Sequence, residues 1–184
     1  MWYNPSDRTL LISDMKAASM RRLNFWYSPK KPKTVSLILD QNMNAELVWT
    51  QTEGINRWKV NEESDAGTNT YTVLEPSFTI GKAHSGICRY TICSLTVDGK
   101  TGPPSEEVED AYSYGRYLYE GDNFAQAILT FKRAGAVIND PRLDDEIVQT
   151  YIQEARALSS RREYEKAIKI LNEAAATSGN MEIS

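Results

Sequence analysis

The sequence predicts an α+β multidomain protein in which a β-sandwich precedes a set of helical hairpins. Before Pro103 and Pro104, short stretches rich in Val, Ile, Thr and aromatic residues alternate with polar turns. After these prolines, Ala, Glu, Leu, Arg and Lys follow one another with helical spacing. A length of 184 residues leaves room for two small domains. We therefore divide the chain into an N-terminal basic and aromatic arm at 1–31, a β-sandwich at 32–105 and a helical region at 106–184.

The β region shows the period of two that marks a strand with one buried face. Val35, Leu37 and Leu39 recur at alternate positions, and a second series consists of Ala45, Leu47 and Trp49. Further runs at 56–60, 70–73, 77–80 and 89–97 are spaced as in a sandwich. The chain therefore contains enough short strands for two packed sheets.

Over about residues 32–105 the chain resembles a fibronectin type III domain. The matching features are Trp49 on the second strand, the aromatic-x-Val strand that begins at Trp58, and the stretch from Tyr90 to Asp98, closed by Gly102-Pro103-Pro104-Ser105. The resemblance implies an immunoglobulin-like sandwich. It also implies that the Tyr90 ring packs in the core and that its hydroxyl bonds back to the chain. Another immunoglobulin-like sandwich remains the alternative.

The end of this region departs from the family pattern. Ser105-Glu106-Glu107-Val108 is typical of a helix start, because serine caps a helix and acidic residues favour its first turn. The last strand of the sandwich is then short or missing. A missing strand would leave a sheet edge that the arm or a partner chain could fill.

The helical region resembles two tetratricopeptide repeats. A first helical face carries Val108, Ala111, Gly115 and Leu118, and Gly121-Asp122-Asn123 forms the turn to a second helix. The family's small and aromatic positions match Gly115, Phe124, Ala127, Phe131 and Ala134, and they recur as Ala155, Tyr164, Ala167, Leu171 and Ala174. In that family these residues pack helices together and bind nothing. A generic pair of hairpins is the alternative.

The two matches are separated by more than one family repeat. Ala127 and Ala167 lie 40 residues apart, against about 34 in the family. We therefore expect an insertion in the loop at 139–145, or a longer second helix in the first hairpin. Two repeats bury little apolar surface by themselves, so they should rest on the sandwich, the arm or another subunit.

The arm is basic and ends in consecutive aromatic residues. Residues 1–34 contain seven basic and two acidic side chains. Leu10-Leu11-Ile12 suggests a short strand, and Ser13 can cap a helix as far as about Leu23. The side chains of Phe25, Trp26 and Tyr27 precede those of Lys30 and Lys31, and we interpret these five as an anchor for a partner protein. Stacking on nucleic-acid bases and a solvated linker are the alternatives.

Composition and motifs exclude several classes of function. The net charge of -4 argues against a protein that coats nucleic acid, and no apolar run is long enough to span a membrane. A secretory signal peptide is not recognisable, which predicts a cytoplasmic protein or one within an intracellular or virion assembly. Cys88 and Cys93 point to opposite faces of one strand and are interpreted as packing thiols, and His84 is the single histidine. We therefore predict no catalytic residues, no cofactor and no metal.

These observations favour a non-enzymatic protein-interaction or scaffold protein that acts in the assembly of a larger complex. Its expected partners are other proteins. The first alternative is a structural subunit of a virion, from a phage or another virus, or of a cytoskeletal particle. An enzyme of unknown type is the second.

Overall fold

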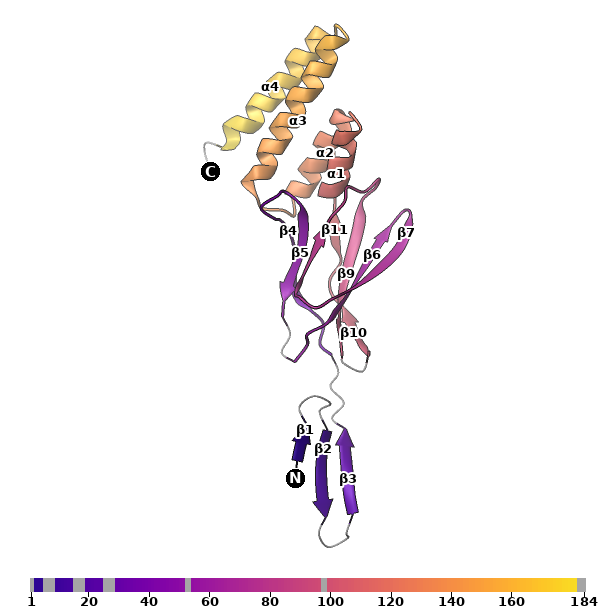
Figure 1. Cartoon of the computed structure of the whole chain (residues 1–184). Helices are drawn as coiled ribbons and strands as arrows, with labels where there is room; N and C mark the ends of the chain where they lie inside the picture. Colours follow the sequence, from indigo (N-terminus) through magenta and orange to yellow (C-terminus); the bar gives the residue numbers. More distant parts are fainter. Residues whose placement is uncertain are drawn as a thin grey trace.

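The computed structural model describes residues 2–4, 9–14, 19–24, 29–51, 54–96 and 99–181, and side chains within 29–51, 54–96 and 99–177. In these residues strands precede helices, and two antiparallel sheets form a sandwich with four helices at one end (Figure 1). The predicted order of a β-sandwich and then helices is confirmed.

The first sheet of the sandwich has the strand order β4–β5–β8. These strands are Lys33–Leu39, Ala45–Thr50 and Ser77–Ile80. The second sheet has the order β7–β6–β9, and β9 pairs on its other side with both β10 and β11. Its strands are β6 at Trp58–Ser64, β7 at Gly67–Val73, β9 at Cys88–Leu95, β10 at Thr101–Pro104 and β11 at Val108–Asp110.

The alternating residues of these strands supply the core between the sheets. Leu37, Leu39, Leu47 and Trp49 are buried from the first sheet. In the second sheet Val60 is paired with Ile92, and both are fully buried. The rings of Trp49 and Trp58 meet edge to face across the core, with centroids 5.9 Å apart.

The last strand is short, as one of the two expectations stated, and it is interrupted, whereas the helix expected to begin at Ser105 is wrong. Ser105 lies between β10 and β11, where its hydroxyl accepts a hydrogen bond from the Ile92 amide at 2.9 Å and its amide donates to the Ile92 carbonyl. The serine side chain thus bridges the gap in the ladder instead of capping a helix. The β11 strand therefore lies in the segment that the sequence assigned to the helical region. Val108 belongs to this strand and not to a helix.

Four helices form two hairpins. Helix α1 spans Tyr112–Glu120, α2 Phe124–Gly135, α3 Pro141–Ser160 and α4 Tyr164–Met181, and the predicted turn at 121–123 is confirmed. The loop between α2 and α3 is short, and α2 is an ordinary 12 residues long. The expected insertion is therefore in neither predicted place. Helix α3 has 20 residues against 9 in α1, and its length accounts for the wide separation of Ala127 and Ala167.

One hydrophobic core runs through the sandwich and the helices. It contains Leu37 and Trp49 from the sheets, Tyr112 and Phe131 from the first hairpin, and Ala174 from α4. Side chains from both regions therefore bury one another, and the helical region rests on the sandwich.

The arm contains strands where the sequence suggested a helix. Strands β1 at Trp2–Asn4, β2 at Thr9–Asp14 and β3 at Ser19–Asn24 form an antiparallel sheet, so the helix expected from Ser13 to Leu23 is wrong. The strand expected at Leu10 to Ile12 is confirmed within β2. Register pairs Leu10 with Leu23 and Ile12 with Arg21, so cross-strand pairing replaces the marginal helix.

Candidate protein interface

The turn between β4 and β5 lies at the contact between the sandwich and the helices. The Asp40 carboxylate accepts hydrogen bonds from the amides of Asn42 and Asn44, both at 2.8 Å, and from the Asn44 side chain. Hydrogen bonds from Asn44 lower the pKa of Asp40. This turn leaves the carbonyls of Leu39, Asp40 and Met43 to accept hydrogen bonds from the helices.

Three helical side chains bind these carbonyls. The Arg142 guanidinium donates to the Asp40 and Leu39 carbonyls at 2.9 and 3.0 Å. The Tyr112 hydroxyl lies 3.0 Å from the Met43 carbonyl and 2.8 Å from the Glu146 carboxylate. Arg116 donates to the Met43 carbonyl at 3.4 Å. Both hairpins are thereby attached to one turn of the sandwich, and this attachment determines where α3 and α4 lie.

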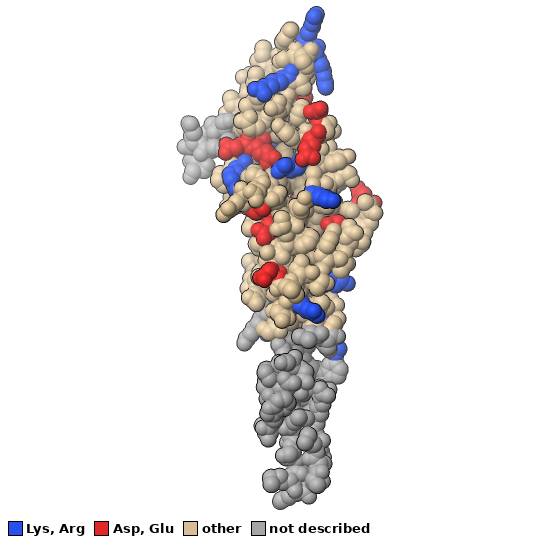
Figure 2. Space-filling view, in the orientation of Figure 1, with Lys and Arg blue, Asp and Glu red and all other residues tan. Residues whose placement is uncertain are grey.

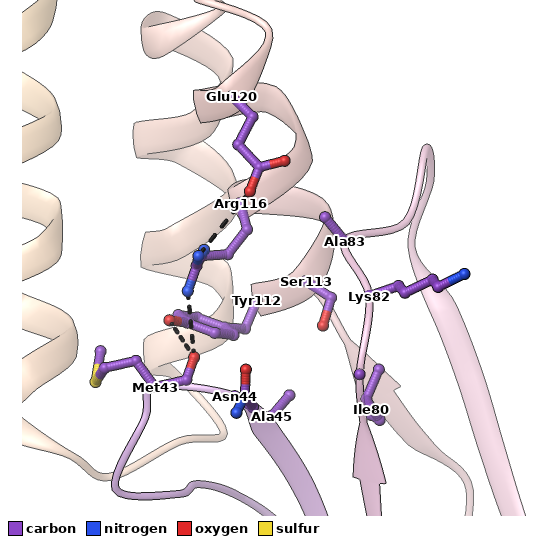
Figure 3. Close-up of a pocket in the computed structure, with 11 residues that line it drawn as sticks. Met43, Asn44, Ala45, Ile80, Lys82, Ala83, Tyr112, Ser113, Arg116 and Glu120 are labelled. Carbon is purple, nitrogen blue, oxygen red and sulfur yellow. Dashed lines mark hydrogen bonds and ion pairs between the residues drawn. The ribbon is translucent and has the colours of Figure 1, made fainter.

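A pocket of about 140 Å³ lies beside this attachment, with Arg116, Tyr112 and Lys82 among its lining residues (Figure 3). Arg116 faces Glu120 at 3.9 Å and Glu146 at 4.0 Å. Burial raises the pKa values of both Glu146 and Tyr112. The polar groups of Arg116 and Tyr112 are thus engaged with other groups of the chain, and we assign them to holding the two regions together.

A second group of titratable side chains lies inside the sandwich. Glu62 and Tyr90 are buried as paired residues of β6 and β9. The Tyr90 hydroxyl lies 3.1 Å from the Glu62 carboxylate and 3.3 Å from His84 Nε2. Burial raises the pKa of Tyr90. The Tyr90 ring is therefore in the core as expected, but its hydroxyl binds side chains and not the main chain, because Glu62 lies opposite it in the sheet.

The cysteines are placed as packing residues. Cys88 and Cys93 are both buried and free of disulfides. Burial raises the pKa of Cys88 to about 11 and also raises that of Cys93, so both thiols stay protonated at neutral pH. Within the described ranges, no cluster of three or more His, Cys, Asp or Glu side chains is arranged to hold a metal ion.

The structural residues named from the sequence are mostly in the core. Trp49, Trp58, Tyr90, Gly115, Ala127, Phe131 and Ala167 are buried. A side chain on Gly115 would lie 2.6 Å from the Phe131 ring, which explains the glycine. Phe124 is half-buried and contacts the Tyr119 ring edge to face at 5.4 Å. Tyr164 differs from all of these, because it is 60% exposed.

The arm residues divide into two groups. Phe25, Trp26 and Tyr27 lie outside the described residues. Lys30 is exposed, and its carbonyl accepts a hydrogen bond from Ser94. Lys31 forms an ion pair with Glu106 of the sandwich. The Lys31 ammonium group is therefore already paired with a carboxylate of the same chain.

Helix α4 exposes an apolar stripe. Tyr164, Ile168 and Leu171 recur at helical spacing and are 60%, 60% and 46% exposed. Another face of α4, with Ala167 and Ile170, packs against Ala155 and Leu158 of α3. The resemblance to repeats implied that Tyr164 and Leu171 pack against other helices, which is wrong for these exposed side chains, and it did not include Ile168. The helical spacing of these three residues is visible in the sequence. Which face of α4 is covered by α3 depends on the tertiary structure.

Charged side chains of both signs lie on the described surface. In the face shown in Figure 2, acidic and basic side chains are interspersed over the described part of the chain. None of the described helices combines the length and apolarity needed to cross a bilayer. The α4 stripe is the exposed apolar surface that we consider as a candidate interface.

The strand order of the described residues defines a class: two antiparallel sheets form a sandwich that resembles fibronectin type III and immunoglobulin-like domains, and four helices follow it. No protein-family profile and no curated protein sequence matches the chain.

Solved structures similar to this chain include fibronectin type III domains. A Fn3-like protein from Clostridium thermocellum is 24% identical, covers 45% of this chain and 92% of its own, and has a TM-score of 0.37. The FN5 domain of Drosophila Lar is 15% identical over 44% of this chain and 92% of its own, with a TM-score of 0.36. Domains d3-d4 of the rat CD45 extracellular region are 12% identical over 60% of this chain and 66% of their own, with a TM-score of 0.43. Because these scores are below 0.5, our description of the sandwich rests on its own strand order.

Proposed function

We propose that this chain is a non-enzymatic protein-interaction module that acts in the assembly of a larger protein complex. The supporting observation is the α4 stripe of Tyr164, Ile168 and Leu171, which leaves large apolar side chains in water on a helix whose Ala167 and Ile170 pack against α3. Exposed apolar surface of this kind marks interaction sites in soluble proteins.

We also propose that the hairpins are tetratricopeptide-like repeats. The small residues of the two hairpins support this, since Gly115 and Ala155 are both buried and so are Ala127 and Ala167. Repeats of this type pack in series, each burying a face of its neighbour. Helix α4 packs along α3 on one side, and we place the partner on its exposed apolar face.

Affinity capture from the native source tests the function. The full chain should retain at least one protein that the Ile168→Ser/Leu171→Ser variant retains about ten-fold less or worse. The matched control is Leu129→Ser/Val137→Ser, which removes apolar side chains of 60% and 54% exposure near α2. Equal capture by the stripe variant and the intact chain would contradict the role of α4.

The arm is a second proposed contact, supported by the consecutive aromatics in the sequence. Phe25→Ala/Trp26→Ala should weaken capture about ten-fold and leave the melting temperature of the sandwich unchanged. Unfolding of the sandwich with capture retained would instead assign these aromatics to its core.

A further inference from the structure

The two hairpins carry equivalent residues in different environments, and the difference indicates what covers α4. Residues 40 positions apart correspond in the sequence, so Ile128 corresponds to Ile168 and Phe131 to Leu171. Ile128 is 5% exposed and Phe131 is fully buried. Their counterparts on α4 are exposed. Helix α2 packs along both α1 and α3, whereas the helix that α4 packs along is α3. Phe131 is buried in part by α1, where it contacts Tyr112 and lies against Gly115.

Helix α3 covers the neighbouring positions of α2. Its buried residues Leu143, Ile147 and Tyr151 follow the spacing i, i+4 and i+8. Leu143 lies against Gly135, and the Tyr151 hydroxyl accepts a hydrogen bond from Lys132 at 2.6 Å. As α3 advances from 143 to 151, its contacts move from 135 back to 132. The two helices are therefore antiparallel.

The charge around α4 indicates which charge a helix that covers the α4 stripe should carry. The turn before α2 is Gly121-Asp122-Asn123, whereas the equivalent turn before α4 is Arg161-Arg162-Glu163. Residues 161–169 contain four basic and two acidic side chains, and one of these basic groups, Lys166, is paired with Glu163. A helix antiparallel to α4 would bring its carboxyl-terminal half to this basic end. Acidic residues there would find complementary charge.

We infer that the α4 stripe binds an amphipathic helix of a partner protein, which runs antiparallel to α4 with apolar residues at i, i+4 and i+8 and acidic residues from about i+11. The inference rests on the proposed function and specifies its partner. The equivalent contact of α3 with α2 supports both the spacing and the direction.

Helix α3 itself supplies the probe. A labelled peptide of residues 141–160, stapled as a helix on its solvent side, carries the apolar spacing, and Glu154 falls at i+11. Fluorescence anisotropy with the full chain should show saturable binding. The Ile168→Ser/Leu171→Ser variant should bind about ten-fold more weakly or worse, and Leu129→Ser/Val137→Ser should bind like the intact chain. A Glu154→Lys peptide should bind about three-fold more weakly, with the difference lost at high salt.

Two results would overturn the inference. The first is a helical peptide that shows no saturable binding, or that binds the stripe variant equally well. If affinity capture still depends on Ile168 and Leu171 in that case, the proposed function stands and the partner is not a helix of this kind. If capture is independent of them as well, both proposals fail. The second is a concentration-dependent dimer in sedimentation of the chain alone that Ile168→Ser/Leu171→Ser abolishes, because the stripe is then covered by a second copy.

Discussion

Asp110 and the two core tryptophans carry polar atoms that burial leaves unsatisfied. Asp110 is fully buried between β11 and α1, and one carboxylate oxygen accepts a hydrogen bond from the Ser113 amide at 3.0 Å. Its other oxygen has no hydrogen-bond partner among the described residues, and neither has the indole nitrogen of Trp49 or Trp58. At the two tryptophans, the free energy gained by apolar packing must therefore exceed the cost of burying an indole nitrogen without a hydrogen bond.

Asp110→Asn should become more stable relative to the natural chain as pH rises from 4 to 8. Burial raises the pKa of Asp110, so the folded state binds its proton more tightly than the unfolded state does. The natural chain then has its full stability below the unfolded pKa of about 3.9 and loses part of it as pH rises through the folded pKa. Asparagine keeps an acceptor for Ser113 and carries no charge. Melting temperatures of both proteins across this pH range measure the effect, and a constant difference would contradict it.

Trp49→Ala should destabilise the fold by about 3–5 kcal/mol, because it leaves a large cavity against Trp58 in the shared core. Urea unfolding measures the change. Leu74→Ala is the control, since Leu74 is 65% exposed and its loss should alter stability by less than about 0.5 kcal/mol. An unchanged midpoint for Trp49→Ala would remove this residue from the core.

Among the elements, the short β4–β5 turn holds both helical hairpins against the sandwich. Its backbone carbonyls receive donors from α1 and α3, so five residues position both hairpins. The interrupted β10–β11 strand is the covalent connection to the helices, because β11 leads directly into α1. Short irregular elements thus determine where the long helices lie.

Arg142→Ala should loosen the first turn of α3 and lower the urea midpoint of the chain, since two hydrogen bonds to carbonyls of the sandwich and the ion pair with Asp140 are lost. Hydrogen exchange should quicken at the β4–β5 turn and at the start of α3. Arg156→Ala, at an exposed position of the same helix, is the control. Equal exchange in both variants would show that the guanidinium does not hold the two regions together.

At the scale of the whole molecule, the continuous core implies that the helices and the sandwich unfold together. Tyr112 packs on Phe131 with ring centroids 5.7 Å apart while its hydroxyl binds the sandwich, so one side chain belongs to both regions. Cooperative unfolding follows when regions share buried side chains in this way.

A fragment of residues 105–184 should therefore melt broadly by circular dichroism, whereas the described sandwich and helices of the intact chain should unfold in one transition. Removal of the sandwich exposes the apolar side of α1 and leaves Tyr112 and Arg142 without their carbonyl partners. A sharp transition of the fragment at the temperature of the intact chain would show that the hairpins are stable alone.

Local patterns by themselves determined the order of strands and helices, the buried faces of Leu37 and Trp49, and the small residues at the helix crossings. Each of these depends on periodicity or residue size within one element, which the sequence displays directly. Tertiary structure alone decided the role of Ser105, whose capping chemistry serves a strand because Ile92 lies beside it. It alone decided that Tyr90 binds Glu62, and that Ile168 and Leu171 face water while Ile128 and Phe131 are buried. These outcomes depend on which elements lie side by side in the fold. The position of a residue in the sequence does not show which side chains pack against it.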